Sequence, residues 1–161
     1  MLKEEITQLA KHIHQTVINN RRHLHAHPEL SFKEYNTSAF VKARLDEMGI
    51  PWNTIANTGV VAIVKGALPS DKVIALRADM DALPVTESNQ VDYASQHEGV
   101  MHACGHDAHT SSLLGTAHIL QSIKHKFGGT VKLIFQPGEE KLPGGASLMI
   151  KEGVLDNPRP H

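Results

Sequence analysis

The sequence has a single cysteine, no long hydrophobic run and no targeting segment. Cys104 has no partner among the 161 residues, which excludes an internal disulfide framework. The longest apolar run, Val60 to Val64, is far shorter than the roughly 20 residues that cross a bilayer. Glu4 and Glu5 stand near the start, and no apolar stretch of signal-peptide length follows them. A chain without bridges or targeting signals is expected in the cytoplasm.

The sequence also lacks an excess of charge of either sign. Its 16 Lys and Arg residues balance 17 Asp and Glu residues, for a formal net charge of -1. No basic field is present to neutralise phosphates, and no polybasic cluster adjoins an apolar helix. Nucleic acids and membranes are therefore not expected as partners. The length and the 40% apolar content predict one ordinary globular domain.

Motifs of several enzyme classes are missing as well. The sequence contains no G-x-S-x-G, no G-x-x-x-x-G-K-[ST], no G-x-G-x-x-G and no H-E-x-x-H. These absences argue against a serine hydrolase, a nucleotide-phosphate loop, a dinucleotide fold and a helical zinc motif. Histidine, by contrast, is abundant, with twelve residues. Because histidine is the commonest metal ligand and titrates nearest neutrality, this enrichment indicates a functional site.

Apolar periodicity and turn residues predict helices that alternate with strands. Two strands around the turn-like LPSD are expected to be joined by a tight connection, and residues 85–101 to form a loop. The order of elements predicts an α/β layered fold with a mixed sheet. The predicted helices cover residues 3–26, the stretch from a capping box at Ser31 and Glu34 to Gly49, residues 107–123 with Asp107 as cap, and residues 146–153; the predicted strands lie between Gly59 and Gly66, at 72–76 and at 130–136.

The strongest local motif is HACGHDAH, residues 102–109. It offers three imidazoles and one thiol within eight residues, a donor set that suits zinc and neighbouring divalent ions. Gly105 allows the backbone to turn so that Cys104 and His106 converge. The predicted helix start favours the thiolate of Cys104 through the backbone dipole. The plainer alternative is a small buried cysteine beside ordinary histidines.

A pair of carboxylates, Glu139 and Glu140, follows the predicted strand 130–136. In extended backbone adjacent side chains point to opposite sides, so one carboxylate can bind a metal while the other faces water or substrate. The alternative is a solvated acidic pair in a loop. The position of the Glu139–Glu140 pair favours a functional site, because functional groups of α/β proteins gather beyond the carboxyl ends of the strands.

Two further polar groups follow predicted elements. Arg77, Asp79 and Asp81 lie on one side if strand 72–76 continues, and Asp79 can accept a hydrogen bond from a metal-bound histidine. A structural salt bridge from Arg77 is the alternative. For the histidines of residues 22–29, packing and capping at the helix end are expected rather than ligation. A cysteine nucleophile remains a rival to the metal site, but it leaves the Glu pair without a task.

Five segments together resemble the amidohydrolase branch of the M20 metallopeptidases. They read RRHLHAHPELSFKE, ALRADMDALPV, MHACGHDAHT, LIFQPGEE and GGASLMIKEGVL. The resemblance implies a zinc-exopeptidase-like three-layer α/β fold with a mixed central sheet, incomplete in this chain. It also implies a metal-dependent hydrolase that cleaves the amide bond of N-acyl amino acids, as aminoacylases do. A dipeptidase or carboxypeptidase using the same site, and a non-catalytic metal-binding fragment, are the alternatives.

The resemblance further implies roles for individual residues around two divalent metal ions (Zn, Mn, Ni or Co). Cys104 bridges the ions, and His106 and Glu140 are ligands. Glu139 is the general base that activates water and then protonates the leaving amine. Asp79 stands in the position of the family's orienting carboxylate.

Members of the family are more than twice as long as this chain. The resemblance therefore implies that residues 1–161 form the N-terminal part of a catalytic domain whose C-terminal part and lid domain are absent. Two more histidine ligands are expected beyond residue 161, and His161 is not expected to be one of them. The isolated chain is expected to be a poor or inactive enzyme. The family's homodimer forms through the lid domain, so a dimer is expected only for a full-length enzyme.

Overall fold

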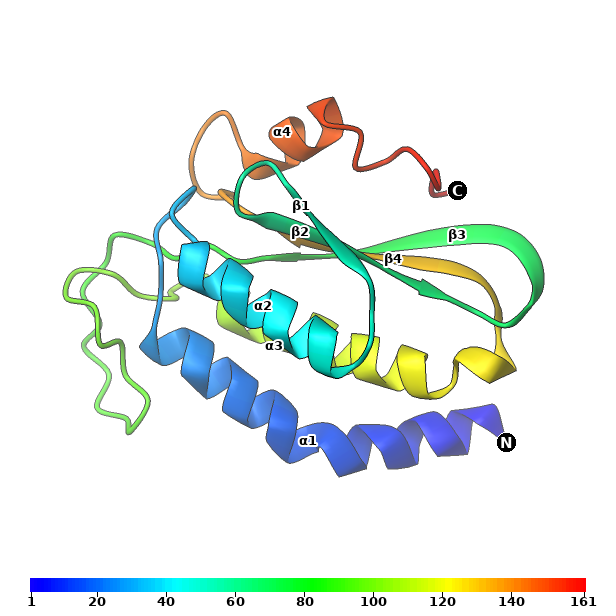
Figure 1. Ribbon diagram of the computed structural model, residues 1–161. Helices are drawn as coiled ribbons and strands as arrows, with labels where there is room; N and C mark the ends of the chain where they lie inside the picture. The colour runs from blue at the N-terminus through cyan, green and yellow to red at the C-terminus, as the bar shows by residue number, and fades with distance from the viewer.

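In the computed structural model, which describes residues 1–161, one sheet of four strands has helices on both faces. Three long helices cover one face, and a short helix lies on the other (Figure 1). The α/β three-layer prediction is confirmed. The elements are α1 (Leu2–Ala26), α2 (Tyr35–Glu47), β1 (Trp52–Ile55), β2 (Gly59–Lys65), β3 (Leu68–Asp79), α3 (His106–Ser122), the 3-10 turn η1 (Lys124–Lys126), β4 (Gly128–Gln136) and α4 (Gly145–Lys151).

The sheet has the strand order β1-β2-β4-β3. β2 pairs with β4 antiparallel, and β3 pairs with β4 parallel, so the predicted mixed sheet is confirmed. The connection between β2 and β3 is short, but LPSD is not the predicted turn, because it forms the first residues of β3. The two strands are not neighbours, because β4 lies between them. β1, an edge strand of four residues, was not predicted, because only one of its side chains is buried.

β4 is buried on both faces, which explains its continuous apolar sequence. Because side chains alternate along a strand, Leu133 and Phe135 join the larger core beneath α2 and α3. Ile134, between them, packs with Met149 of α4 in a smaller core on the opposite face. The strand that ends at the QPGEE segment is therefore held rigidly from both sides.

The capping box predicted at Ser31 and Glu34 does not form. Glu34 precedes α2, but its side chain makes no capping hydrogen bond. The carboxylate of Glu29 serves the helix start instead, because it accepts hydrogen bonds from the main-chain N–H groups of Asn36 and Thr37. The prediction failed because Ser31 and Glu34 have more distant partners, which are described below.

The cap predicted at Asp107 is also wrong. α3 begins one residue earlier, at His106, and Gly105 precedes it with φ +81°, a conformation that glycine adopts without strain. The Asp107 carboxylate instead pairs with Arg21 at 2.7 Å and with His25 at 2.8 Å, which links α3 to α1. None of the helices is both long and apolar enough to cross a membrane.

His161 lies along the free edge of β3. Its main-chain N–H donates to the carbonyl of Val73, and its Nδ1 accepts from the N–H of Val73, both at 3.1 Å. Val73 precedes Asp79 by about 20 Å of strand. His161 is therefore remote from the end of β3 where the polar clusters gather, as expected for a residue that is not a ligand.

Candidate metal centre

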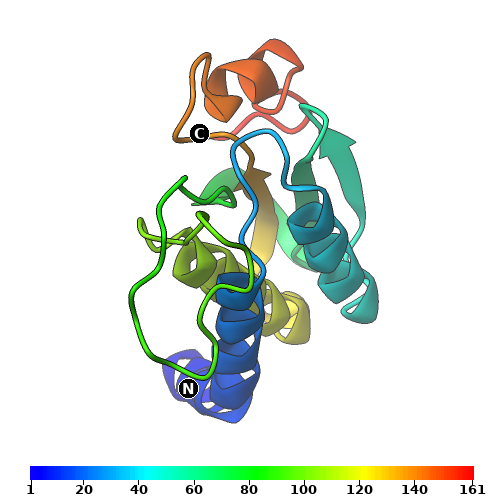
Figure 2. The same ribbon diagram turned by 90° about the vertical axis from the view of Figure 1, so that its left-hand side faces the viewer.

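Three polar segments meet at one end of the sheet. β3 and β4 run parallel and end side by side, with Asp79 paired to Gln136. The segment after β4 carries Glu139 and Glu140, and α3 starts with His106 at the same end. Figure 2 views the molecule from this end, where the loop that follows β3 (green) lies in front of the helices. The clusters singled out in the sequence therefore share one location, beyond the carboxyl ends of two parallel strands.

Cys104, His106 and Glu140 form the predicted set of metal ligands. One donor atom from each, sulfur, nitrogen and oxygen, lies within 4.8 Å of the others. His106 Nε2 is 3.8 Å from Glu140 Oε1, and this buried oxygen has no hydrogen-bond partner. A buried carboxylate oxygen without a partner is costly unless a cation or water satisfies it. The donor set and the unsatisfied oxygen both fit a divalent cation.

The orientation of His106 is set by the chain just after β3. Nδ1 of His106 lies 2.8 Å from the carbonyl oxygen of Asp81, and a carbonyl only accepts, so Nδ1 carries the proton. In the neutral ring the lone pair is then on Nε2, which lies toward Cys104 and Glu140. This is the arrangement that a metal-binding imidazole requires. His106 donates this hydrogen bond to Asp81 and not to Asp79, the acceptor that the sequence had suggested.

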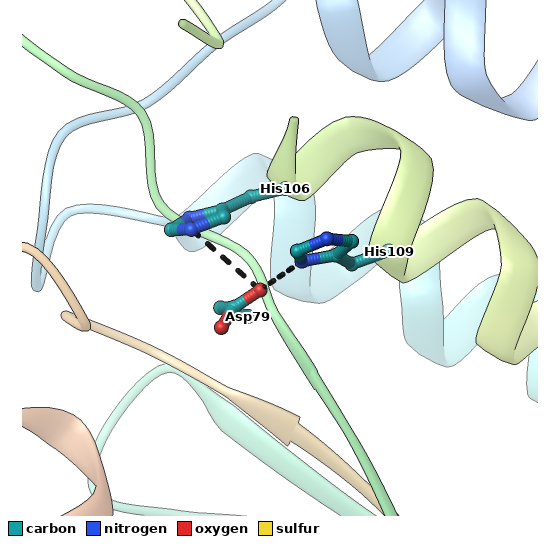
Figure 3. A group of neighbouring side chains, drawn as sticks. All are labelled: Asp79, His106 and His109. Atoms are coloured by element: carbon teal, nitrogen blue, oxygen red, sulfur yellow. Dashed lines mark hydrogen bonds and ion pairs between the residues drawn. The ribbon is translucent and has the colours of Figure 1, made fainter. Parts of the chain in front are cut away.

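Asp79 lies between two histidines (Figure 3). Its Oδ1 accepts a hydrogen bond from Nδ1 of His109 at 2.6 Å and is 3.6 Å from Nε2 of His106. Its Oδ2 accepts from Arg77 at 2.6 Å, so the salt bridge considered as an alternative is present too. Asp79, His106 and His109 form a second group of donor atoms within 4.8 Å of one another. The guanidinium of Arg77 on the same carboxylate makes this group the less favourable cation site.

The electrostatics of the protein groups favour an added positive charge. Burial alone would lower the pKa of His106, but its hydrogen bond to Asp81 and the charge of Asp79 raise that pKa to about 9. Burial alone would raise the pKa of Asp81, but hydrogen bonds from His106 and Ser31 lower it to about 2. The raised pKa of His106 indicates that the carboxylates around it carry more negative charge than the nearby cations balance. A divalent cation would neutralise this charge.

The thiol of Cys104 does not behave as the helix-dipole argument predicted. The adjacent Glu140 carboxylate, and after it desolvation and the charge of Glu139, raise the pKa of the thiol above its usual range. The adjacent carboxylates outweigh the dipole of α3, because a full charge at contact distance exceeds the partial charge of a helix end. Among the protein groups alone, the thiolate is disfavoured.

Glu139 and Glu140 differ in environment, although not for the reason given from the sequence. The backbone after β4 bends rather than continuing extended, and Gly138 has φ +53°. Glu139 is exposed, and Glu140 is half-buried with its N–H donating to Oδ2 of Asp81 at 3.0 Å. One carboxylate therefore faces solvent while its neighbour faces His106.

A second polar network lies behind the centre, around His25 of α1. Nδ1 of His25 lies 2.8 Å from Asp107, and Nε2 lies 3.0 Å from Glu87. His23, on the same helix, stacks on Phe40 with ring centroids 4.4 Å apart. These contacts agree with the packing role expected for residues 22–29. The partners of His25 were not predicted, because they are 82 and 62 residues away in the sequence.

Comparisons with known proteins find similar sequences over nearly the whole chain. The sequence pattern of "Peptidase family M20/M25/M40" matches residues 75–161, more than half of the chain. The chain is 48% identical over 157 residues to an N-acyl-L-amino acid amidohydrolase of Geobacillus stearothermophilus, with 97% of this chain and 42% of that protein covered. It is 44% identical to thermostable carboxypeptidase 1 of Saccharolobus solfataricus, with 96% and 40% covered.

A solved structure of the same family has the same fold. The Bacillus subtilis YXEP protein, described as a dinuclear metal binding peptidase from the M20 family, superimposes with a TM-score of 0.86 at 45% identity. The match covers 91% of this chain and 41% of that one. The chain thus spans about 40% of the length of the relatives it matches.

Proposed function

Because the chain belongs to peptidase family M20/M25/M40, we propose that it forms the N-terminal part of the catalytic domain of a metal-dependent hydrolase that cleaves the amide bond of N-acyl amino acids. The near half identity to an N-acyl-L-amino acid amidohydrolase supports the substrate class. The partner is then a small molecule with an amide next to a free carboxylate. A homodimer and a cytoplasmic location stay predictions for the longer protein.

Cys104, His106 and Glu140 would hold the cations in this proposal, with Cys104 as the bridge between two of them. The observation that carries the proposal is the convergence of their donor atoms within 4.8 Å around a buried Glu140 oxygen that has no partner. Sulfur, nitrogen and carboxylate oxygen together accommodate Zn, Mn, Ni or Co. When bound, such ions polarise an amide carbonyl and make water more acidic.

The protein side chains would divide the proton transfers. Glu139 is exposed beside the ligand Glu140, so its carboxylate can take a proton from water and return it to the leaving amine nitrogen. Asp81 keeps Nδ1 of His106 protonated and Nε2 free. Asp79 holds His109 and Arg77 at the rim of the site.

A carboxypeptidase or dipeptidase activity is the second candidate, because the chain is 44% identical to a protein named carboxypeptidase. Both activities cleave an amide beside a free carboxylate. Turnover of N-acetyl amino acids compared with dipeptides and carboxyl-blocked peptides separates them. Hydrolysis of N-acetyl amino acids, without hydrolysis of dipeptides that have a free amino group, supports the amidohydrolase.

The direct test of the metal centre is the metal content of the purified chain by elemental analysis, with Cys104→Ser as the variant. We expect bound divalent metal in the wild type and its loss in the variant. Metal that remains in equal amount without Cys104 would overturn the ligand assignment. Activity that resists chelators but is blocked by alkylation of Cys104 would favour a cysteine hydrolase instead.

A further inference from the structure

Glu34 is a completely buried carboxylate with no cationic partner. Its side chain has 0% exposure. Its Oε1 accepts hydrogen bonds from the main-chain N–H groups of Phe32 and Gly138, each at 2.8 Å, and its Oε2 accepts from Oγ1 of Thr58 at 2.7 Å. Burying a carboxylate away from cations is unfavourable unless its oxygens are well satisfied. Since Glu29 already serves the start of α2, the position of Glu34 has another explanation.

The bond from Gly138 connects Glu34 to the segment that carries the two catalytic-site carboxylates. Gly138 immediately precedes Glu139, and its φ of +53° turns the chain out of β4. A side chain at this position would collide with the ring of Phe32. The carbonyl of Gly138 accepts from the N–H of Gly145, which closes the loop onto the start of α4. Glu34 thus binds the loop at its turning point, 104 residues away in the sequence.

A second contact joins the same N-terminal segment to the centre. Oγ of Ser31 donates to Oδ2 of Asp81 at 2.6 Å, and that oxygen also accepts from the N–H of Glu140. The segment before α2 therefore holds the loop at two successive points, Gly138 through Glu34 and Glu140 through Asp81. These are the partners that prevented the expected capping box.

We propose that Glu34 is a positioning residue of the metal centre: by accepting the Gly138 N–H it fixes the loop after β4 so that Oε1 of Glu140 faces Nε2 of His106. The inference rests on the proposed function for the identity of the site. All three partners of Glu34 donate, so an acceptor is required. A glutamine meets this need, because its oxygen serves Phe32 and Gly138 while the Thr58 hydroxyl reverses its role and accepts.

Cobalt binding tests the proposal without any assay of turnover. Co²⁺ added to the 161-residue chain gives a sulfur-to-cobalt charge-transfer absorption if Cys104 is a ligand, and its titration gives the dissociation constant. We expect Glu34→Met, which keeps the volume but accepts poorly, to weaken Co²⁺ binding by about 10–100-fold, the usual effect of removing a group that orients a ligand. Glu34→Gln should restore binding close to the wild type.

Glu29→Ala is the matched control. It removes a carboxylate of the same segment whose hydrogen bonds go to the start of α2 and not to the loop after β4. It should lower stability while leaving the dissociation constant for Co²⁺ unchanged. A folded Glu34→Met chain that binds Co²⁺ as tightly as the wild type overturns the proposal. Should Glu34→Met not fold, Glu34→Asp replaces it, since its shorter side chain withdraws the carboxylate from Gly138 and carries the same expectation.

Amide hydrogen exchange in the absence of metal separates this inference from the proposed function. Exchange at Gly138 and Glu140 should accelerate in Glu34→Met while the amides within β4 stay protected. If the wild type gives no cobalt absorption, the ligand role of Cys104 fails, and the exchange at Gly138 alone decides whether Glu34 fixes the loop. Unchanged exchange at Gly138 would show that it does not.

Discussion

The carbonyl of Asp81 accepts the Nδ1 proton of His106 at 2.8 Å, and the carboxylate of the same residue accepts the N–H of Glu140 at 3.0 Å. Asp81, two residues beyond the end of β3, thus orients two of the proposed ligands at once. Removal of the Asp81 charge should affect both ligands, whereas a change at an exposed aspartate of β3 should affect neither.

Asp81→Asn should lower the pKa of His106 from about 9, because it removes the negative charge that stabilises the imidazolium. The same variant should weaken zinc binding by about 10–100-fold, since the Glu140 main chain loses an anionic acceptor. An NMR titration of His106 in the metal-free chain and a zinc competition assay measure the two effects. Asp71→Asn is the control, because Asp71 is exposed at the start of β3. An unchanged His106 pKa in Asp81→Asn would contradict this assignment.

Glu139→Gln should leave metal binding nearly unchanged, because Glu139 belongs to neither group of clustered donor atoms. In an enzyme that contains this segment together with the remaining ligands, the same change should reduce turnover by about 10²–10⁴-fold, the usual contribution of a general base. Metal content and amide hydrolysis are the measurements. Turnover retained at the wild-type rate would remove Glu139 from the role of base.

Glu87 should make the stability depend on pH in the acid range. Burial alone would raise its pKa, but hydrogen bonds from Ser95 and His25 lower it from 4.5 to about 2 in the folded chain. A depressed pKa stabilises the fold above pH 4.5, and this contribution is lost as the pH falls toward 2. Urea unfolding of the wild type and Glu87→Gln should therefore differ most above pH 5 and converge near pH 2. A difference that stays constant over this range would refute the linkage.

Phe135→Ala should destabilise the fold by about 3–5 kcal/mol, because the side chain is fully buried between β4 and the long helices. Ile74→Ala is the matched control on the neighbouring strand, where the side chain is 58% exposed. We expect the control to change stability by no more than about 0.5 kcal/mol. Denaturant unfolding measures the loss of unfolding free energy in both variants. A similar loss in the two would contradict the placement of Phe135 in the core.

Local patterns predicted the elements well, since α1 and α3 follow the helical spacing of their apolar residues. The meeting of the HACGHDAH and QPGEE motifs was also predictable, because both follow or precede elements that end at one edge of the sheet. The predictions that failed concern residues whose hydrogen-bond partners are distant in the chain. Ser31 and Glu34 fit a capping box locally, yet their hydrogen bonds go to Asp81 and Gly138.

The same limit explains the missed strand and the strand order. β1 has too few buried side chains to show a period, and nothing within β2 or β3 indicates that a later strand will separate them. His25 pairs with Asp107 and Glu87, which are 82 and 62 residues away. These separations are far longer than the short stretches over which helical or strand periodicity is recognised. Only the assembled sheet and helices bring such groups together.

The central place of β4 has a consequence for how the chain folds during synthesis. β2 and β3 leave the ribosome first, but neither can pair with the other, because the strand that joins them follows α3 in the chain. Their edges remain open until Gly128 and the residues after it emerge, and open strand edges in a nascent chain invite association with other chains. Glu139 and Glu140 follow within four residues of the end of β4, so these carboxylates lie beside His106 only once β4 has emerged and paired with β3.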